Sequence, residues 1–564
     1  MECETLSDGG RDLEAPMRAW WLILVSLVLL CPPTPARAQG EHAHEAGDLG
    51  RVGTAHFPVT CEPELQEEFD RAVAILHSFF YEESERQFAS IASVDPRCAM
   101  AWWGVAMSLW HPLWEPPDST SLARGWTAIQ RADSLGSGSE RERAYIAALA
   151  CFYRNWDRVD HRTRALAYEH AMEKLHAQFP EDTEAAIFYA LALNATLQYS
   201  DKSYAKQRRA GAILEPIYAK QPDHPGVAHY LIHSYDFPTL ASRALPMAQH
   251  YADIAPHVPH ALHMPSHIFT RLGMWDESIR SNLAAAQASR EYSGAHDGGA
   301  VYYDAVHAWD YLEYAYLQKA QDRKARAICD SVAAIRRVSH QTLSFFYALT
   351  SVPARYALEH HAWSEAAALE LPSGWSWNRY PWTEATTEFA RALGAARSGR
   401  PDIAREAIAR LAAIRDGIVN PALLDWAAQV EAQRRTAEAW LALSEGHEAE
   451  GLASMRAAAA LEDSTEKRPV TPGAVLPARE LLGDMLLETH HPAEALAAYE
   501  AVLRDAPGRF NALAGASRAA LACQQAAAAQ RYAVELIALA KDGDGDRPEL
   551  AEARRVAGGA TNAR

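Results

Sequence analysis

Cysteine is scarce in this sequence and basic residues are never clustered. These two absences argue against a disulfide-rich protein and against a protein that binds nucleic acid or an anionic membrane. The chain has 564 residues and seven cysteines. Beyond residue 38 the cysteines are Cys61, Cys98, Cys151, Cys329 and Cys523. Because they are odd in number and widely spaced, no disulfide framework is expected, and several should pack as small apolar side chains within helices. The net charge of −18 and the lack of any Lys/Arg cluster argue against a surface for nucleic acid or an anionic membrane.

Familiar catalytic motifs are also missing. The sequence has no glycine-rich phosphate loop, no G-x-S-x-G, no H-E-x-x-H and no C-x-x-C. The sequence therefore gives no motif support for a nucleotide-binding protein, a serine hydrolase, a zincin or a thioredoxin. The sequence names no reaction, and a role other than catalysis is favoured.

The segment 1–38 has the pattern of a secretory signal peptide. Met17-Arg18 precedes twelve apolar residues from Ala19 to Leu30, and Ala36-Arg37-Ala38 supplies a cleavage motif. Twelve apolar residues are too few to span a bilayer, so no stable membrane span is expected after cleavage. The acidic stretch before Met17 fits poorly, which leaves Met1 and Met17 as alternative starts. We expect an exported protein, periplasmic or secreted, with a mature charge of −16 because the leader carries five acids and three arginines.

Beyond residue 61 the pattern is helical almost throughout. Apolar residues recur at steps of three and four, and no alternating run is typical of a strand. Prolines interrupt this pattern where helices should end, and the step from Pro222 to Pro256 equals the step from His229 to His263. These features predict an all-α protein built from a repeated helical unit.

The repeated unit resembles the tetratricopeptide repeat (TPR) family. Its clearest copy has Leu482-Gly483, then Ala495, Tyr499 and Pro507 at the spacing of the family motif. The resemblance implies a solenoid, or superhelix, of about ten helix-turn-helix repeats, with a concave face that binds a protein or peptide partner. The expected divisions are a signal peptide at 1–38, a linker at 39–60, an N-terminal array with a histidine-rich inner wall at 61–340, degenerate repeats at 341–460, C-terminal TPR units at 461–541 and a polar tail at 542–564.

Two histidine pairs repeat with the period of a TPR unit, which is about 34 residues. His229 and His233 recur one period later as His263 and His267. Residues four apart share one face of a helix, so each pair should project from the first helix of its unit toward one wall. The same alignment places Asp310 on the first helix of the next unit, where His229 and His263 stand in theirs.

This histidine wall has two interpretations. Neutral imidazole is the commonest protein ligand for transition metals, so the four histidines with Asp310 predict a site for copper, zinc or iron. Alternatively, repeat duplication has simply copied polar groove residues that contact a peptide. Ten of the 24 histidines lie between residues 224 and 307, which favours a specific role, whereas Pro265 should distort the second pair unless it begins a helix. A partner-binding scaffold is the first hypothesis and a metal-binding protein or metalloenzyme is the alternative.

Three further residues are candidate partner contacts. Glu480 and Asp484 form a carboxylate pair on one helical face, suited to a basic peptide. Tyr314 is aligned with His233 and His267 and should face the same groove. A solvated acidic face is the plainer explanation of the carboxylates.

Overall fold

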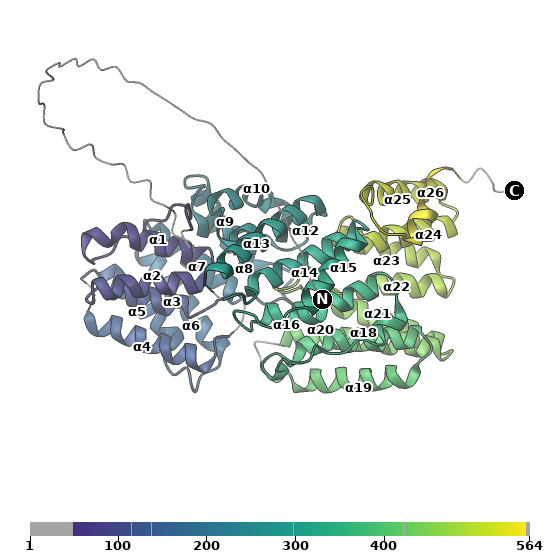
Figure 1. The fold of residues 1–564 in the computed structure, drawn as a ribbon, viewed down its shortest axis with the longest axis horizontal. Coiled ribbons are helices and arrows are strands. Elements are labelled where there is room, and N and C mark those ends of the chain that lie inside the picture. The colour runs from purple at the N-terminus through teal and green to yellow at the C-terminus, as the bar shows by residue number, and fades with distance from the viewer. Residues whose placement is uncertain (1–48, 114–115, 137, 297, 421–423, 560–564) are drawn as a thin grey trace, which may run out of the picture. The chain divides into compact units, whose positions relative to one another are not determined.

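The computed structural model describes residues 49–113, 116–136, 138–296, 298–420 and 424–559. These described residues belong to one compact unit, and the predicted signal peptide lies outside them. Helices dominate this unit (Figure 1), and its described part holds no β-strand, only an isolated bridge between Val301 and Val338. The prediction of an all-α, tetratricopeptide-like solenoid is confirmed.

The helices follow one another as a continuous series. They are α1 (Gln66–His77), α2 (Tyr81–Val94), α3 (Ala99–Ser108), α4 (Ser119–Leu135), α5 (Glu140–Tyr153), α6 (His161–Gln178), α7 (Thr183–Ala195), α8 (Ala205–Tyr218), α9 (Pro225–Tyr235), α10 (Leu245–Ile254), α11 (Pro259–His263), α12 (Pro265–Arg271), α13 (Trp275–His296), α14 (Tyr303–Gln318), α15 (Asp322–Ala333), α16 (Leu343–Glu359), α17 (Trp363–Ala366), α18 (Glu384–Arg397), α19 (Pro401–Gly417), α20 (Leu424–Ser444), α21 (Glu448–Asp463), α22 (Ala478–Glu488), α23 (Pro492–Asp505), α24 (Phe510–Ala522), α25 (Ala526–Leu539) and α26 (Pro548–Ala557). Short 3₁₀ turns lie at Pro63–Leu65, Ala241–Ala244, Trp377–Arg379 and Pro381–Thr383.

One turn geometry recurs along the chain. Eight three-residue turns join a first helix to a second, and the middle residue of each has a φ between 51° and 85°. The middle residues are Phe79, Gly273, Ala320, His361, Gly399, Gly446, His490 and Gln524. A left-handed residue ends a helix by satisfying its last carbonyls, so the chain reverses abruptly and the second helix packs against the first. This repeated turn is the physical basis of the helix pairs.

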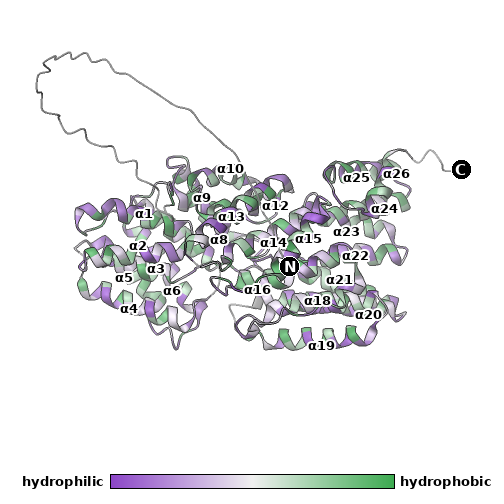
Figure 2. Ribbon diagram, viewed as in Figure 1, coloured by the Kyte–Doolittle hydropathy of each residue, from purple (hydrophilic) through white to green (hydrophobic). Residues whose placement is uncertain are grey.

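The pairs stack through faces rich in alanine and aromatic residues. Hydrophobic and hydrophilic stripes alternate around the helices in Figure 2, as expected when each pair buries one face against its neighbours. Close packing is visible at Gly211 and Gly483, where an added Cβ would overlap Tyr235 and Tyr499 respectively. None of the described helices is both long enough and apolar enough to traverse a membrane.

Cysteine usage differs in part from the sequence expectation. Cys61 and Cys98 form a disulfide, whereas Cys151, Cys329 and Cys523 are free. Cys61 and Cys98 are 37 residues apart, a spacing that matches no sequence motif. The helices between them bring the two sulfurs together. The disulfide therefore closes the first helix pair.

Two segments that were expected to lie outside the repeats are packed against them. The described part of the predicted linker is packed into the unit, and Phe57 is fully buried against Trp103 and Tyr145. The predicted polar tail contains α26, with Leu550 buried, and Arg547 bonds to the carboxylate of Asp322. Each segment is held by only a few buried side chains. These are too few to produce a periodic pattern in the sequence.

Residues 464–477 form a strap, an irregular segment between α21 and α22. The strap contacts helices far away in sequence, since the Glu466 amide donates to the Tyr199 carbonyl and Tyr311 donates to the carbonyls of Pro469 and Thr471. The strap therefore packs against α14 at Tyr311. Its position matters for the site described below.

Phe57→Ala should destabilise the protein strongly, because it empties an aromatic cluster in which the nearest ring centroid, that of Tyr145, is 4.8 Å away. A loss of about 3–5 kcal/mol is expected for such a cavity, read as a lower urea midpoint or Tm. Val94→Ala is the control, because Val94 is 66% exposed and should be nearly neutral. Equal midpoints for the two variants would contradict the packing of the N-terminal segment.

Candidate metal centre

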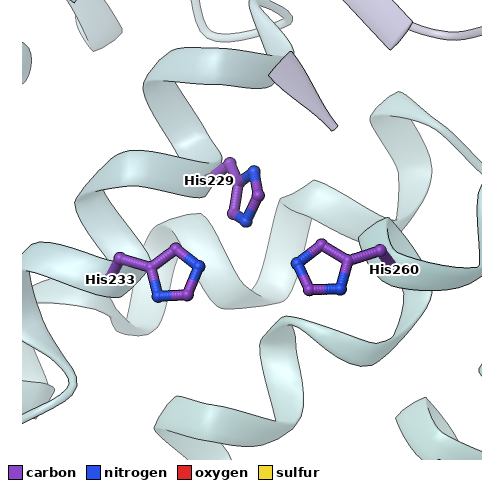
Figure 3. Close-up of side chains that lie close together, drawn as sticks. All are labelled: His229, His233 and His260. Carbon is purple, nitrogen blue, oxygen red and sulfur yellow. The ribbon is translucent and has the colours of Figure 1, made fainter. Parts of the chain in front are cut away.

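Three histidines from two helices meet in the interior. His229 and His233 project from α9, and His260 projects from α11. One ring nitrogen of each lies within 4.8 Å of the others, and their side chains are buried. Figure 3 shows the three rings directed toward a common gap. We call this group the first triad.

A second triad lies directly beside the first. It consists of His263 from α11, His267 from α12 and His307 from α14, again within 4.8 Å and buried. The Nε2 atoms of His263 and His267 are 3.1 Å apart. Two nitrogens bound to one tetrahedral metal at about 2 Å each lie about 3.3 Å apart, so this pair already has the spacing of two ligands.

Pro265 explains how one short stretch serves both triads. It lacks an N–H and therefore begins a new helix, α12, directly after α11. The helix is thus interrupted at Pro265, as the sequence predicted, and residues 259–271 are divided between α11 and α12. As a result, His260 joins the first triad, whereas His263 and His267 join the second.

All six imidazoles are held in the neutral form. Burial lowers the pKa of each one below its ordinary value, for His229 to about 3. The pKa of His267 is lowered even though the carboxylate of Asp236 acts to raise it. Neutral imidazole is the form that binds a metal, because its second nitrogen keeps a lone pair.

Three of the histidines also have their ring orientation fixed. The Nδ1–H of His229 donates to the His77 carbonyl at 2.7 Å, and the Nδ1–H of His263 donates to Oδ1 of Asn282 at 2.6 Å. The Nδ1 of His267 is 2.9 Å from Oδ2 of Asp236. In each case Nε2 keeps the lone pair and faces the triad. Metal-binding histidines characteristically donate their other nitrogen to a carbonyl or carboxylate in this way.

Asp236 is itself held by two cations. Lys467 Nζ on the strap lies 2.7 Å from its Oδ2, and Arg271 Nε lies 2.9 Å from its Oδ1. Although burial acts to raise the pKa of Asp236, Lys467 and Arg271 hold it well below its ordinary value. The carboxylate therefore remains charged and keeps His267 in one orientation.

The first triad contains buried ring nitrogens that the protein does not satisfy. Nε2 of His229 and both ring nitrogens of His233 have no hydrogen-bond partner among the described residues. Leaving a buried polar atom unpaired costs about 1–3 kcal/mol. An atom that is oriented, neutral and unpaired is suited to a bound ion.

Aromatic rings enclose both triads. The ring centroid of Phe79 is 4.3 Å from that of His229, and Phe79 stacks on His233 and His260. Tyr311 packs against the second triad, with its centroid 4.8 Å from that of His263. These rings exclude water and lower the local dielectric.

Asp310, which the repeat alignment placed beside the histidines, is a member of neither triad. Its Oδ1 accepts from Arg355 and from Ser351, both at 2.8 Å. The difference is one of register, because the step from His263 to His307 is longer than the preceding step from His229 to His263. The 22-residue helix α13 accounts for the added length, so His307 and Tyr311 face the site one turn before Asp310 and Tyr314 would.

The residues predicted to contact a partner lie elsewhere. Glu480 and Tyr314 are buried and both bond to Arg509, Glu480 at 2.7 and 2.8 Å and the Tyr314 hydroxyl at 3.2 Å. Asp484 accepts from the hydroxyl of Tyr499. A partner would have to displace Arg509 to reach Glu480, whereas Tyr314 also lines a cavity of about 210 Å³.

A third histidine group has a supporting role. Glu184 accepts from His77 and from His224, at 2.9 Å each, and the other nitrogen of His77 pairs with the Tyr230 hydroxyl. Both ring nitrogens of His77 are thus engaged, as expected of a buried structural histidine. The backbone carbonyl of this fixed residue is the one that orients His229.

The sequence predicted four of the six triad histidines as candidate ligands. His260 and His307 were not among the candidates. The signal for His260 was its position three residues before His263, within the same dense stretch of histidines.

Comparisons with known proteins give little more. No family model matches the chain, and no curated protein matches it. Among solved structures, yeast Tom70 matches with a TM-score of 0.33 and 8% sequence identity, over 87% of this chain and 95% of that one. A TM-score this low carries no argument about function.

The metal-free protein should lose stability on acidification. Each triad histidine has a folded pKa below its unfolded value of about 6.5, so the unfolded state takes up more protons as the pH falls. The contribution of these histidines to the free energy of unfolding is therefore complete above about pH 6.5. It declines toward pH 3, by up to about 1.4 kcal/mol per pH unit for each histidine.

Urea midpoints of the metal-free protein at several pH values measure this slope. His229→Gln should flatten it, whereas Val94→Ala, at an exposed position without a titratable group, should leave it unchanged. A slope that is the same in all three proteins would contradict the assignment of buried neutral imidazoles.

Proposed function

We propose that this protein binds two transition-metal ions, one in each histidine triad. The observation that carries the proposal is the arrangement of the ring nitrogens. His229, His263 and His267 each direct Nε2 inward because a fixed acceptor holds Nδ1. A histidine cluster inherited only by duplication would not require these acceptors, which come from three different helices or turns.

Copper fits the donor set better than zinc or iron. Each triad offers three imidazoles and no carboxylate. Imidazole sites bind copper most tightly among the first-row divalent ions. Non-haem iron sites commonly include a carboxylate, and Asp236 contacts His267 instead of joining a triad.

Export is part of the proposal. The leader predicts it, and the Cys61–Cys98 disulfide supports it because such bonds persist in oxidising compartments. The helical repeats then act as a rigid frame that brings α9, α11, α12 and α14 to one centre.

Metal analysis of the reconstituted protein tests the proposal. The wild type, purified without an affinity tag, should bind two copper ions per chain, and His229→Ala or His263→Ala should lose one each. The double variant should lose both. Copper at 100 times its dissociation constant should stabilise the wild type by about 2.7 kcal/mol per site.

The control is His250→Ala, which removes a histidine outside both triads and should keep both ions. Circular dichroism identifies variants that have failed to fold. If the folded double variant retains two ions, or if the wild type takes up none from copper, zinc or iron, the metal proposal is wrong.

Partner binding is a second proposal, at a cavity that borders Arg271 and Lys467, the two cations paired with Asp236. A cavity of about 210 Å³ is lined by Tyr347, Trp382 and Trp426 together with charged residues that include Arg271 and Lys467. Aromatic walls with a few charged groups are typical of sites that receive a side chain of a peptide. A protein or peptide could insert one residue here.

A photo-crosslinker at Gln433, which lines this cavity, tests partner binding. A specific crosslinked protein is expected in the exported fraction, and Trp426→Ala should abolish it. A crosslinker at Val534, which is 52% exposed on α25, is the control. The same products from both positions would contradict a partner site at this cavity.

A further inference from the structure

The two triads are close enough to act as one centre. Ring centroids of His233 and His267 are 5.7 Å apart, and those of His260 and His263 are 6.0 Å apart. Each of these pairs joins one triad to the other. Ions bound about 2 Å from the inward nitrogens would therefore lie within reach of a single small bridging ligand.

Charge constrains which ions and which bridge this centre favours. All six ligands are neutral, and the nearby carboxylate of Asp236 is already matched by Lys467 and Arg271. Two divalent ions would place four positive charges in a buried region without compensation, which is costly. Two singly charged copper(I) ions halve that charge. After oxidation, a dianionic bridge would compensate half of the charge of two copper(II) ions.

Dioxygen supplies such a bridge without any other reactant. Each copper(I) gives up one electron, and dioxygen accepts both to become a peroxide dianion bound between two copper(II) ions. No proton is needed and no bond to the protein changes. Atoms and electrons balance within the pair, whereas a single copper could supply only one of the two electrons.

Access to the centre is also suited to a very small ligand. A cavity of about 10 Å³ reaches His233, and its wall combines Leu113, Leu197 and Phe237 with the polar side chains of Asn194, Asp236 and Lys467. Such a volume holds about one water molecule. Phe79 covers the first triad and Tyr311 packs against the second. A diatomic molecule is compatible with a space of this size, whereas an organic substrate is too large for it.

We propose that the paired triads bind dioxygen between two copper ions. This inference rests on the proposed function, since it needs both sites to hold copper. The ligand is dioxygen itself, and the six histidines and the small size of the adjoining cavity are the features that select it. The predicted activity is reversible dioxygen binding, without an organic co-substrate.

Anaerobic reconstitution followed by oxygen exposure tests the inference. The full-length mature protein is loaded with copper(I), its copper content is measured, and dioxygen uptake is then recorded. We expect one dioxygen per two coppers and a new near-ultraviolet charge-transfer band. The oxidised pair should give no electron paramagnetic resonance (EPR) signal, because a shared bridge couples the two copper(II) spins.

His263→Ala is the informative variant. It should keep copper in the first triad, take up at least about tenfold less dioxygen, and give the EPR signal of an isolated copper(II) after oxidation with ferricyanide. His250→Ala should behave as the wild type. These two variants separate loss of pairing from general damage.

The outcomes distinguish the two proposals. Two bound coppers without dioxygen uptake, or with an EPR signal that accounts for both, would overturn the dioxygen inference and leave the metal site standing. No bound copper would overturn both. Equal uptake by His263→Ala and the wild type would show that pairing is not required, and would also overturn the inference.

Discussion

The interior of this protein depends on keeping six imidazoles buried and uncharged. Burial is the main cause that depresses their pKa values, and the neighbouring histidines depress them further. A neutral ring can still rotate unless a hydrogen bond holds it. The backbone of His77, the amide of Asn282 and the carboxylate of Asp236 hold three of the six rings, those of His229, His263 and His267. Contacts with other helices and with the strap hold each of these three acceptors in place.

Each acceptor is held by an element of its own. His77 ends α1 and is fixed through Glu184. Asn282 lies on α13, where its amide N–H donates to the Ser278 carbonyl and leaves its oxygen for His263. Asp236 is matched by Lys467 of the strap. Helix pairs from separate parts of the sequence therefore converge on one centre, and the strap closes it.

The sequence predicted the parts of this arrangement that follow a local period. Helices, their pairing and the two histidine pairs all follow from the helical period and from the TPR repeat length. The structure places His229 and His263 on successive first helices. The same repeat length misplaced Asp310, because α13 lengthens one repeat. A single long helix is enough to shift the register of every residue aligned after it.

Other features could not be read from a period. His260 joins the first triad because Pro265 divides its helix, and the sequence showed the proline without showing where the break would send each ring. The strap and the anchoring of Phe57 depend on contacts between residues far apart in the chain. Such contacts are set by packing, for which a single sequence has no repeated signal.

X-ray absorption spectroscopy of the copper-loaded protein tests the central claim most directly, because it measures the ligands and the neighbouring ion together. The account predicts about three imidazole nitrogens per copper at about 2 Å and a second copper in the next shell. Oxygen or sulfur ligands in place of imidazole, or isolated coppers in the doubly loaded protein, would contradict it.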